Sequence, residues 1–180
     1  MHTTTTTEEA SPTVLIKKAR RRTQYHLKGI SCLLDPSIRI GDYLCELGCK
    51  PHVCAAGYLH KSLGHKGLDS DHLTRLLGEQ VSEIVEALQY EEDESSLDVE
   101  SELDLMDRVE MVGADALVIK IVEWIDFIRN LSREKTNSAV RRRIKMIVEQ
   151  WLQRGENILG AAHQAIIDLK TTIDNAEVLA

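Results

Sequence analysis

The sequence predicts an all-α protein that folds as a single helical domain. Apolar residues recur every three to four positions along most of the 180-residue chain, and no segment shows the apolar–polar alternation of a strand. Aromatic residues make up only 4% of the chain, so the core must be built from Leu, Ile, Val and Ala, which suits packed helices. The length is that of one domain, with enough residues to bury a substantial core.

The chain opens with a polar tail, residues 1–12, which contains a run of threonines and which we expect to be disordered. Residues 13–180 are expected to form the helical domain. Its first helix is basic, because Lys17–Arg22 contains five cations beside a short apolar stripe. A turn is expected at Lys28-Gly29, where this helix ends.

The second helix is predicted to begin at Asp35-Pro36-Ser37 and to end at Gly48. A third helix of small apolar residues is predicted over Val53–Leu59, and its composition indicates that it is buried. It carries His60 at its end. The next segment, His65–Gly67, is predicted to be a loop.

Asp69-Ser70-Asp71 predicts the start of a short leucine-rich helix, and Gly78 separates that helix from the next one. The strongest shift in composition lies at residues 91–107, which contain nine carboxylates. We expect an acidic, solvated loop there, or a frayed helix. This segment could neutralise a basic helix of a neighbouring subunit.

Three more helices are predicted in the C-terminal part of the chain. A long apolar helix begins at Ala114, and its apolar positions continue to Ile128. Apolar residues at helical spacing predict two further helices, the first over 140–152 and the second from Ile158 to Ile173.

Composition excludes several classes of function. The formal net charge of −7 disfavours a general nucleic-acid-binding surface, which needs clustered cations. No apolar run is long enough to span a membrane, and the first residues lack the apolar core of a signal peptide, so we expect a cytoplasmic protein without a membrane partner. The four cysteines are expected to be reduced and buried; a zinc site is the alternative, but no Cys-x-x-Cys pair is present.

Cys54–His65 is the most informative segment. It presents His60 at the end of a small apolar helix and a second histidine, His65, in the loop that follows. Histidine is a common ligand of divalent metals, so this segment is a candidate for a metal site. The residue after His60 is Lys61, however, and a protonated lysine has no lone pair with which to bind a metal.

Several segments match one pattern in chain order. They are Lys28-Gly29 for K-x-G, Asp35-Pro36 for H-P, Leu44–Gly48 for L-A-E-L-G, His60–His65 for H-D-x-x-E-D, Leu77–Val81 for F-G-x-x-V, and Val118–Ile125 for V-K-L-A-D-R-L. Together they resemble the guanosine tetraphosphate (ppGpp) hydrolase domain of the RelA/SpoT family and its small stand-alone relatives, which belong to the HD superfamily. The resemblance extends over residues 24–169 and implies an HD-type helical domain.

In that family two histidines and two aspartates hold a manganese ion, and a Glu-Asp pair supports the attacking water. The resemblance places the first histidine at Asp35, or at Pro36 if no gap is allowed, and keeps the second as His60. The aspartate that follows it is Lys61 in this chain. The Glu-Asp pair is Gly64-His65. The metal site is therefore degenerate.

The family's last aspartate falls on Glu123, or on Asp126 if the register slips by three residues. At a few ångströms, repulsion between Lys61 and a metal would cost at least several kcal/mol with an effective dielectric of ~20. We therefore expect no cofactor. The ammonium of Lys61 is predicted to take the place of the metal and to pair with Glu123 or Asp35. The remnant of the site is His60, Lys61, Gly64, His65 and Glu123.

Two functions remain open. The first is a catalytically inactive relative that acts as a binding or regulatory module, as a homodimer or with a nucleotide or other small anion as ligand. Lys28 and Arg129 are its expected anion contacts, whereas the family's nucleotide-contacting Asn is Phe127 here. The alternative is an active metal-dependent phosphohydrolase acting on a nucleotide or pyrophosphate. It would hold manganese or another divalent metal with Asp35, His60, His65 and Glu123.

Overall fold

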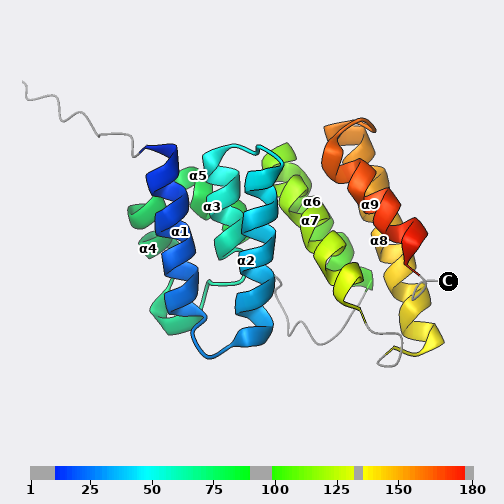
Figure 1. The fold of residues 1–180 in the computed structure, drawn as a ribbon, viewed down its shortest axis with the longest axis horizontal. Helices are drawn as coiled ribbons and strands as arrows, with labels where there is room; N and C mark the ends of the chain where they lie inside the picture. The colour runs from blue at the N-terminus through cyan, green and yellow to red at the C-terminus, as the bar shows by residue number, and fades with distance from the viewer. Residues whose placement is uncertain (1–10, 90–98, 132–135, 177–180) are drawn as a thin grey trace, which may run out of the picture.

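The computed structural model describes residues 11–89, 99–131 and 136–176. Within these ranges the chain forms nine α-helices and one 3-10 helix, without any strand, which confirms the predicted all-α fold (Figure 1). The predicted polar tail lies outside the described residues except for its last two positions. Among the helices of the described ranges, none has both the length and the apolar character needed to cross a bilayer.

The first half of the chain contains five α-helices and the 3-10 helix: α1 (Pro12–His26), α2 (Ser31–Glu46), α3 (Pro51–Leu59), η1 (His65–Gly67), α4 (Ser70–Leu77) and α5 (Glu79–Ala87). The second half contains the longer helices. These are α6 (Val99–Val112), α7 (Ala114–Asn130), α8 (Ser138–Leu159) and α9 (Gln164–Asn175).

Several predicted boundaries are confirmed by local hydrogen bonds. The carboxylate of Asp69 accepts a hydrogen bond from the backbone N–H of His72 at 2.7 Å, which caps the start of α4. Gly78 separates α4 from α5 with a φ of 96°, a value that favours glycine. Gly48 follows the end of α2, and its N–H donates to the carbonyl of Cys45 at 3.0 Å.

The predicted start of α2 is wrong by four residues. The helix begins at Ser31, and Pro36 lies inside it rather than at its first turn. The turn before the proline is already closed, because the carbonyl of Ile30 accepts hydrogen bonds from the backbone N–H groups of Leu33 and Leu34. Pro36 therefore lies within the helix and does not mark its first turn.

The solvated loop predicted at residues 91–107 is wrong from Val99 onward, where α6 begins; the alternative of a helix holds there, although its buried side chains show that it is not a frayed one. Residues 90–98 lie outside the described part of the chain. Leu105, Met106 and Val109 are buried on one side of α6 and supply the packing that a solvated loop would lack. Val109 follows Leu105 by four residues and Met106 by three, which places all three on one side of the helix. The high density of carboxylates hid this spacing.

Two smaller corrections concern the loops. His65–Gly67 forms the 3-10 turn η1 instead of an open loop. Ile158 belongs to the last turn of α8, which runs to Leu159, whereas the prediction assigned it to the final helix. The chain turns at Gly160, which has a φ of 90°, and α9 begins at Gln164.

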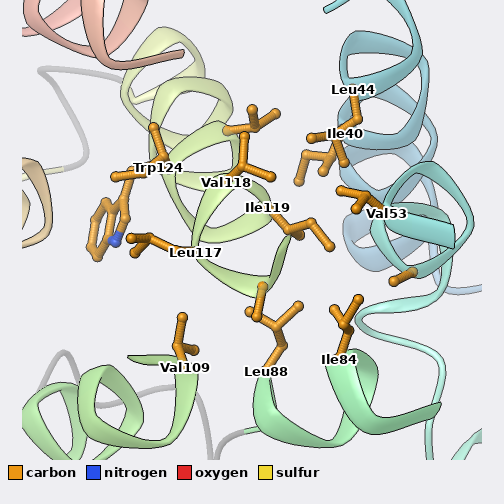
Figure 2. Packing of buried hydrophobic residues seen from close by; sticks show 14 of the residues in the cluster. Ile40, Leu44, Val53, Ile84, Leu88, Val109, Leu117, Val118, Ile119 and Trp124 are labelled. Carbon is orange, nitrogen blue, oxygen red and sulfur yellow. The ribbon is translucent and has the colours of Figure 1, made fainter. Parts of the chain in front are cut away.

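The central element is α7, which packs against α2, α3, α5, α6, α8 and α9. Figure 2 shows apolar side chains of α2, α3, α5 and α6 meeting those of α7 in one cluster. They include Ile40 and Leu44 of α2, Val53 of α3, Ile84 of α5, Val109 of α6, and Leu117, Val118 and Ile119 of α7. Because α7 is covered on most sides, a polar side chain on its covered faces must find a partner inside the protein.

Two glycines let α2 and α3 approach each other closely. A Cβ atom at Gly41 would come within 2.2 Å of the ring of Tyr58, and a Cβ at Gly57 would come within 2.2 Å of a methyl group of Leu44. Such distances are shorter than any real contact, so Gly41 is required beside the rigid ring of Tyr58, whereas at Gly57 the terminal methyl group of Leu44 would have to shift. The close approach fixes the end of α3, and with it the place of the residues that follow.

Candidate functional site

His60 follows α3 directly and is only 1% exposed. Its Nδ1 donates a hydrogen bond to the carbonyl oxygen of Gly57 at 2.7 Å, whereas its Nε2 has no hydrogen-bond partner among the described residues. Burial lowers the pKa of the ring to about 4, although the carboxylate of Glu123 acts in the opposite direction. At neutral pH the ring is therefore uncharged, with a proton on Nδ1 and a lone pair on Nε2. Metal-binding histidines in proteins commonly have this arrangement.

Lys61 pairs with Glu123, as predicted. Its ammonium lies 2.9 Å from Oε1 of that carboxylate, and both side chains are less than one-fifth exposed. Asp35, the other partner considered from the sequence, is exposed on α2. The ammonium therefore contacts the carboxylate of α7 close to the buried imidazole.

A second ammonium binds the other oxygen of the same carboxylate. Lys120, one turn before Glu123 on α7, places its Nζ 3.0 Å from Oε2 and is 2% exposed. The same Nζ lies 5.4 Å from the ring centre of Trp124 and 5.7 Å from that of Trp151. The two aromatic rings offer the buried ammonium partly negative faces, which offset some of the lost hydration.

Glu102 of α6 extends this network to a third helix. One carboxylate oxygen lies 3.9 Å from the Nζ of Lys120, and the other accepts a hydrogen bond from the indole N–H of Trp151 on α8 at 2.9 Å. We refer to Lys61, Glu123, Lys120, Glu102 and Trp151 as the buried charge chain. It links the end of α3 to α6, α7 and α8.

The formal charges of the buried charge chain balance, because it contains two ammonium groups and two carboxylates. Burial by itself would raise the pKa of Glu123, but the ammonium groups of Lys120 and Lys61 outweigh it and hold that pKa well below its usual range. Glu123 is thus ionised at neutral pH. Its charge is already compensated by side chains.

Asp126, the other candidate for the family's last aspartate, also has a side-chain cation. The guanidinium of Arg39 on α2 binds it through two hydrogen bonds, at 2.6 and 2.9 Å. The Arg39 side chain is nearly half exposed, so this pair reaches solvent. Both candidate positions on α7 therefore hold a carboxylate that is bound to a cation of the chain itself.

The remaining predicted site residues lie elsewhere. Gly64 is exposed in the turn before η1, and the backbone carbonyl of His65 accepts a hydrogen bond from Nδ1 of His26 on α1 at 3.1 Å. Nowhere in the described ranges do three or more His, Cys, Asp or Glu side chains form a group suited to a metal ion. The structure thus brings His60, Lys61 and Glu123 together, but it does not gather Asp35, His60, His65 and Glu123 into one ligand set.

The two expected anion contacts are in separate surroundings. Lys28 is exposed in the turn after α1. The guanidinium of Arg129, near the end of α7, lies 5.6 Å from the ring centre of Tyr43 on α2. Phe127 packs edge-to-face against Trp124, with 5.4 Å between ring centres. Lys28 and Arg129 share no contact partner among the residues that the structure describes.

Sequence reasoning missed Lys120 and Glu102. Lys120 interrupts an apolar run between Ile119 and Ile121, and a lysine within such a run is a signal for a buried, paired charge. Glu102 gave no comparable signal, because it stood among eight other carboxylates. Its burial depends on the rotation of α6, which the composition of the segment concealed.

Gln89 and Arg108 hold the backbone around His60. The side-chain amide of Gln89, just after α5, donates to the carbonyl of His60 at 2.7 Å and also to that of Val85 at 2.8 Å. The guanidinium of Arg108 on α6 donates to the carbonyl of Gln89. The position of His60 is thus fixed from α3, α5 and α6 together.

Comparisons of the chain with protein-family models, curated proteins and solved structures find no match. The resemblance to the HD superfamily thus remains a prediction based on the segments quoted from the sequence. The geometry around His60 stands independently of it. It consists of a neutral buried imidazole next to a carboxylate that is bound by two ammonium groups.

Proposed function

We propose that this chain is an HD-like helical domain without a catalytic metal, and that it acts as a binding or regulatory module. The observation that carries the proposal is the contact between Lys61 and Glu123, at 2.9 Å. In the resemblance to ppGpp hydrolase domains, both residues stand at positions of metal ligands. Here one of them is a cation, and it neutralises the other.

Electrostatics supports the loss of the metal. A divalent ion bound to Glu123 would have to displace Lys61 or share the carboxylate with it and with Lys120. At about 4 Å and an effective dielectric of about 20, a divalent cation and one ammonium repel each other by roughly 8 kcal/mol. A single imidazole, that of His60, offers little compensation, since such metals are normally held by several carboxylate or imidazole ligands.

The state of His60 is compatible with an origin in a metal site. Most buried polar atoms in proteins have a hydrogen-bond partner, and His26 shares with His60 an Nε2 atom that lacks one among the described residues, so what distinguishes His60 is the neighbouring carboxylate of Glu123. His60 uses Nδ1 for the carbonyl of Gly57 and leaves Nε2 without a described partner, next to Glu123. An imidazole oriented in this way is what remains when the ligand geometry persists and the cation is replaced by an ammonium.

The proposal is tested by measuring phosphate and pyrophosphate release from guanosine tetraphosphate and from a panel of nucleotides in the presence of manganese. We expect no release above that of the buffer. Release that disappears in the His60→Ala variant would overturn the proposal and would identify the chain as an active hydrolase. The His72→Ala variant, at a histidine on α4, serves as the matched control.

A second experiment asks whether only the ligands were lost. The triple variant Lys61→Asp, Gly64→Glu and His65→Asp restores the carboxylates of the family pattern. Metal uptake by this variant, with none by the wild type, is expected. A control with Lys145→Asp on the exposed side of α8 carries the same charge change as Lys61→Asp at a position far along the chain. Uptake by the wild type would contradict the proposal.

The ligand class proposed for the module is a nucleotide or another small anion. A rise of the unfolding temperature on addition of one nucleotide from the panel, without its hydrolysis, is the expected sign of binding. If no nucleotide, and neither inorganic phosphate nor pyrophosphate, changes the unfolding temperature from that of the protein alone, small anions are not the ligand class of the module.

A further inference from the structure

One face of α1 is exposed and basic. Its residues Val14, Lys17, Lys18, Arg21 and Tyr25 are spaced by 3, 4, 7 and 11 positions from the first, so they lie on one side of the helix. Val14 and Tyr25, at its two ends, are 52% and 59% exposed. We call these five residues the basic stripe. They also line most of a surface hollow of about 580 Å³.

One face of α6 is exposed and acidic, with the same spacing. Glu100, Leu103, Asp104, Asp107 and Met111 again follow the first residue by 3, 4, 7 and 11 positions. Met111 is 87% exposed and Leu103 is 37% exposed. The opposite side of α6 is the one that packs into the core. We call these five residues the acidic stripe.

Most charges of the two stripes form no ion pair within the described residues, although the ammonium of Lys18 donates a hydrogen bond to the backbone carbonyl of Leu76 at 2.6 Å. Lys17, Arg21, Glu100 and Asp104 form no ion pair with any residue of the described ranges. Asp107 is bound to Arg154 at 3.1 Å, but its side chain is 72% exposed. The two helices pack in different places, α1 on α2 and α3, and α6 on α5, α7 and α8 (Figure 1).

We propose that the basic stripe of one molecule docks on the acidic stripe of a second copy of this chain. The match is clearest when the helices run antiparallel. Val14 then lies opposite Met111, Lys18 opposite Asp107 and Arg21 opposite Asp104, while the hydroxyl of Tyr25 faces Glu100. The antiparallel arrangement also pairs opposite ends of the two helix dipoles. Both stripes span the same length, about 16 Å at 1.5 Å per residue.

Charge and shape favour a second copy over other occupants. A membrane with anionic lipids would attract the basic stripe but would leave the acidic stripe and the exposed Met111 without a role. A second copy satisfies both stripes with one contact. Because the two stripes differ, the contact is heterologous, so each docked molecule still offers one free stripe to another copy.

The contact is expected to be weak and sensitive to salt, since it joins two single helices through exposed charges. Sedimentation equilibrium of the full chain at low ionic strength should show an average mass that rises with protein concentration. In about 0.5 M salt, where charges are screened within about 4 Å, the mass should return to that of the monomer.

Two charge-reversal variants test the pairing directly. Lys17→Glu with Arg21→Glu makes the basic stripe acidic, and Glu100→Lys with Asp104→Lys makes the acidic stripe basic. Each variant alone should associate at least about 10-fold more weakly than the wild type, because like charges then face each other. An equimolar mixture of the two should recover association, since the intact basic stripe of the second variant can dock on the intact acidic stripe of the first, and the two reversed stripes are again opposite in charge.

A control variant, Arg142→Glu with Lys145→Glu on α8, changes the net charge as much as the first variant and should associate like the wild type. Circular dichroism of all variants confirms that the exposed substitutions leave the helices folded. A wild type that stays monomeric at every concentration would overturn the proposal, and so would a mixture that fails to associate. Binding of a monomeric wild type to vesicles of anionic phospholipid would assign the basic stripe to a membrane instead. These outcomes do not depend on metal binding or hydrolysis, so they leave the proposed function untouched.

Discussion

Glu123 and Asp126 lie one turn apart on α7, and each binds a cation of the chain, yet their surroundings differ. Asp126 is held by Arg39, whose side chain is 46% exposed, whereas Glu123 is held by Lys61 and by Lys120, which is 2% exposed. The two carboxylates are similarly buried, since the Asp126 side chain is 16% exposed and that of Glu123 is 19% exposed, so the contrast lies in their cations, of which the guanidinium of Arg39 can exchange its partner for water. The carboxylate of Glu123 cannot do so without leaving Lys120 buried and uncompensated.

The two carboxylates of α7 are therefore expected to differ in how much their ion pairs contribute to the stability of the fold. An ion pair that reaches solvent contributes little, commonly 0–1 kcal/mol, because water replaces either partner. Removing one member of a buried network is costly, about 3–5 kcal/mol, since the charge left behind has lost its hydration. The buried charge chain is therefore part of the core, while the Arg39–Asp126 pair belongs to the surface.

The largest effect is expected for Lys120→Met. This variant keeps the approximate volume of the side chain but removes the ammonium between Glu123 and Glu102. The free energy of unfolding, measured with denaturant, should fall by about 3–5 kcal/mol. The control Lys145→Met, at an exposed position of α8, should stay within about 0.5 kcal/mol of the wild type. A loss below about 1 kcal/mol for Lys120→Met would show that the ion pairs of this lysine contribute no more to stability than an exposed pair does.

A comparable effect is expected from pH, through His60. Its pKa is lowered from 6.5 to about 4 in the folded chain, so the unfolded chain binds the proton more readily. The stability from this group is therefore complete above pH 6.5 and is lost as the pH falls toward 4, by about 3 kcal/mol. Glu123, whose pKa is also lowered, adds a loss in the same direction at still lower pH.

The measurement is the free energy of unfolding at several pH values between 7 and 4, for the wild type and for His60→Gln. The variant should show a flatter dependence over this range, because the titrating ring is gone. His72→Gln on α4 is the control and should keep the slope of the wild type. An unchanged slope in His60→Gln would show that another group causes the acid sensitivity.

The smallest effect is expected at the exposed pair. Arg39→Ala should lower the free energy of unfolding by about 0.5–1 kcal/mol, and added salt should reduce the difference. The matched control is Arg75→Ala on α4, an exposed arginine without an ion pair in the described ranges, which should be nearly neutral. A loss of several kcal/mol at Arg39 would mean that the two carboxylates of α7 do not differ as described.

The helices themselves could be predicted, because burial imposes a spacing of three to four residues on apolar positions. The pair of Lys61 and Glu123 was also predictable, with Asp35 as the alternative partner, because the resemblance to ppGpp hydrolase domains placed all three residues at positions of metal ligands. Lys120 and Glu102 were not found. Their contact depends on how α6 and α7 are rotated against each other, and the sequence of α6 suggested a solvated loop.

The local starts and ends of helices were predictable only in part. Asp69 and Gly78 act through their own backbone and nearest neighbours, so their roles could be inferred from the sequence. The start of α2 was placed too late, because Pro36 signals a preference for the first turn but is tolerated deeper in a helix. Packing against α3 and α7 decides how far α2 extends, and this information is not local.

The proposed replacement of a metal by the ammonium of Lys61 is tested most directly by equilibrium dialysis of the folded wild type against manganese, with the bound metal counted by mass spectrometry. The wild type is expected to hold no more manganese than the buffer. The Lys61→Asp variant, which adds a carboxylate next to Glu123 and His60, is expected to bind it more tightly than the wild type. Stoichiometric manganese in the wild type, lost in His60→Ala, would contradict the replacement.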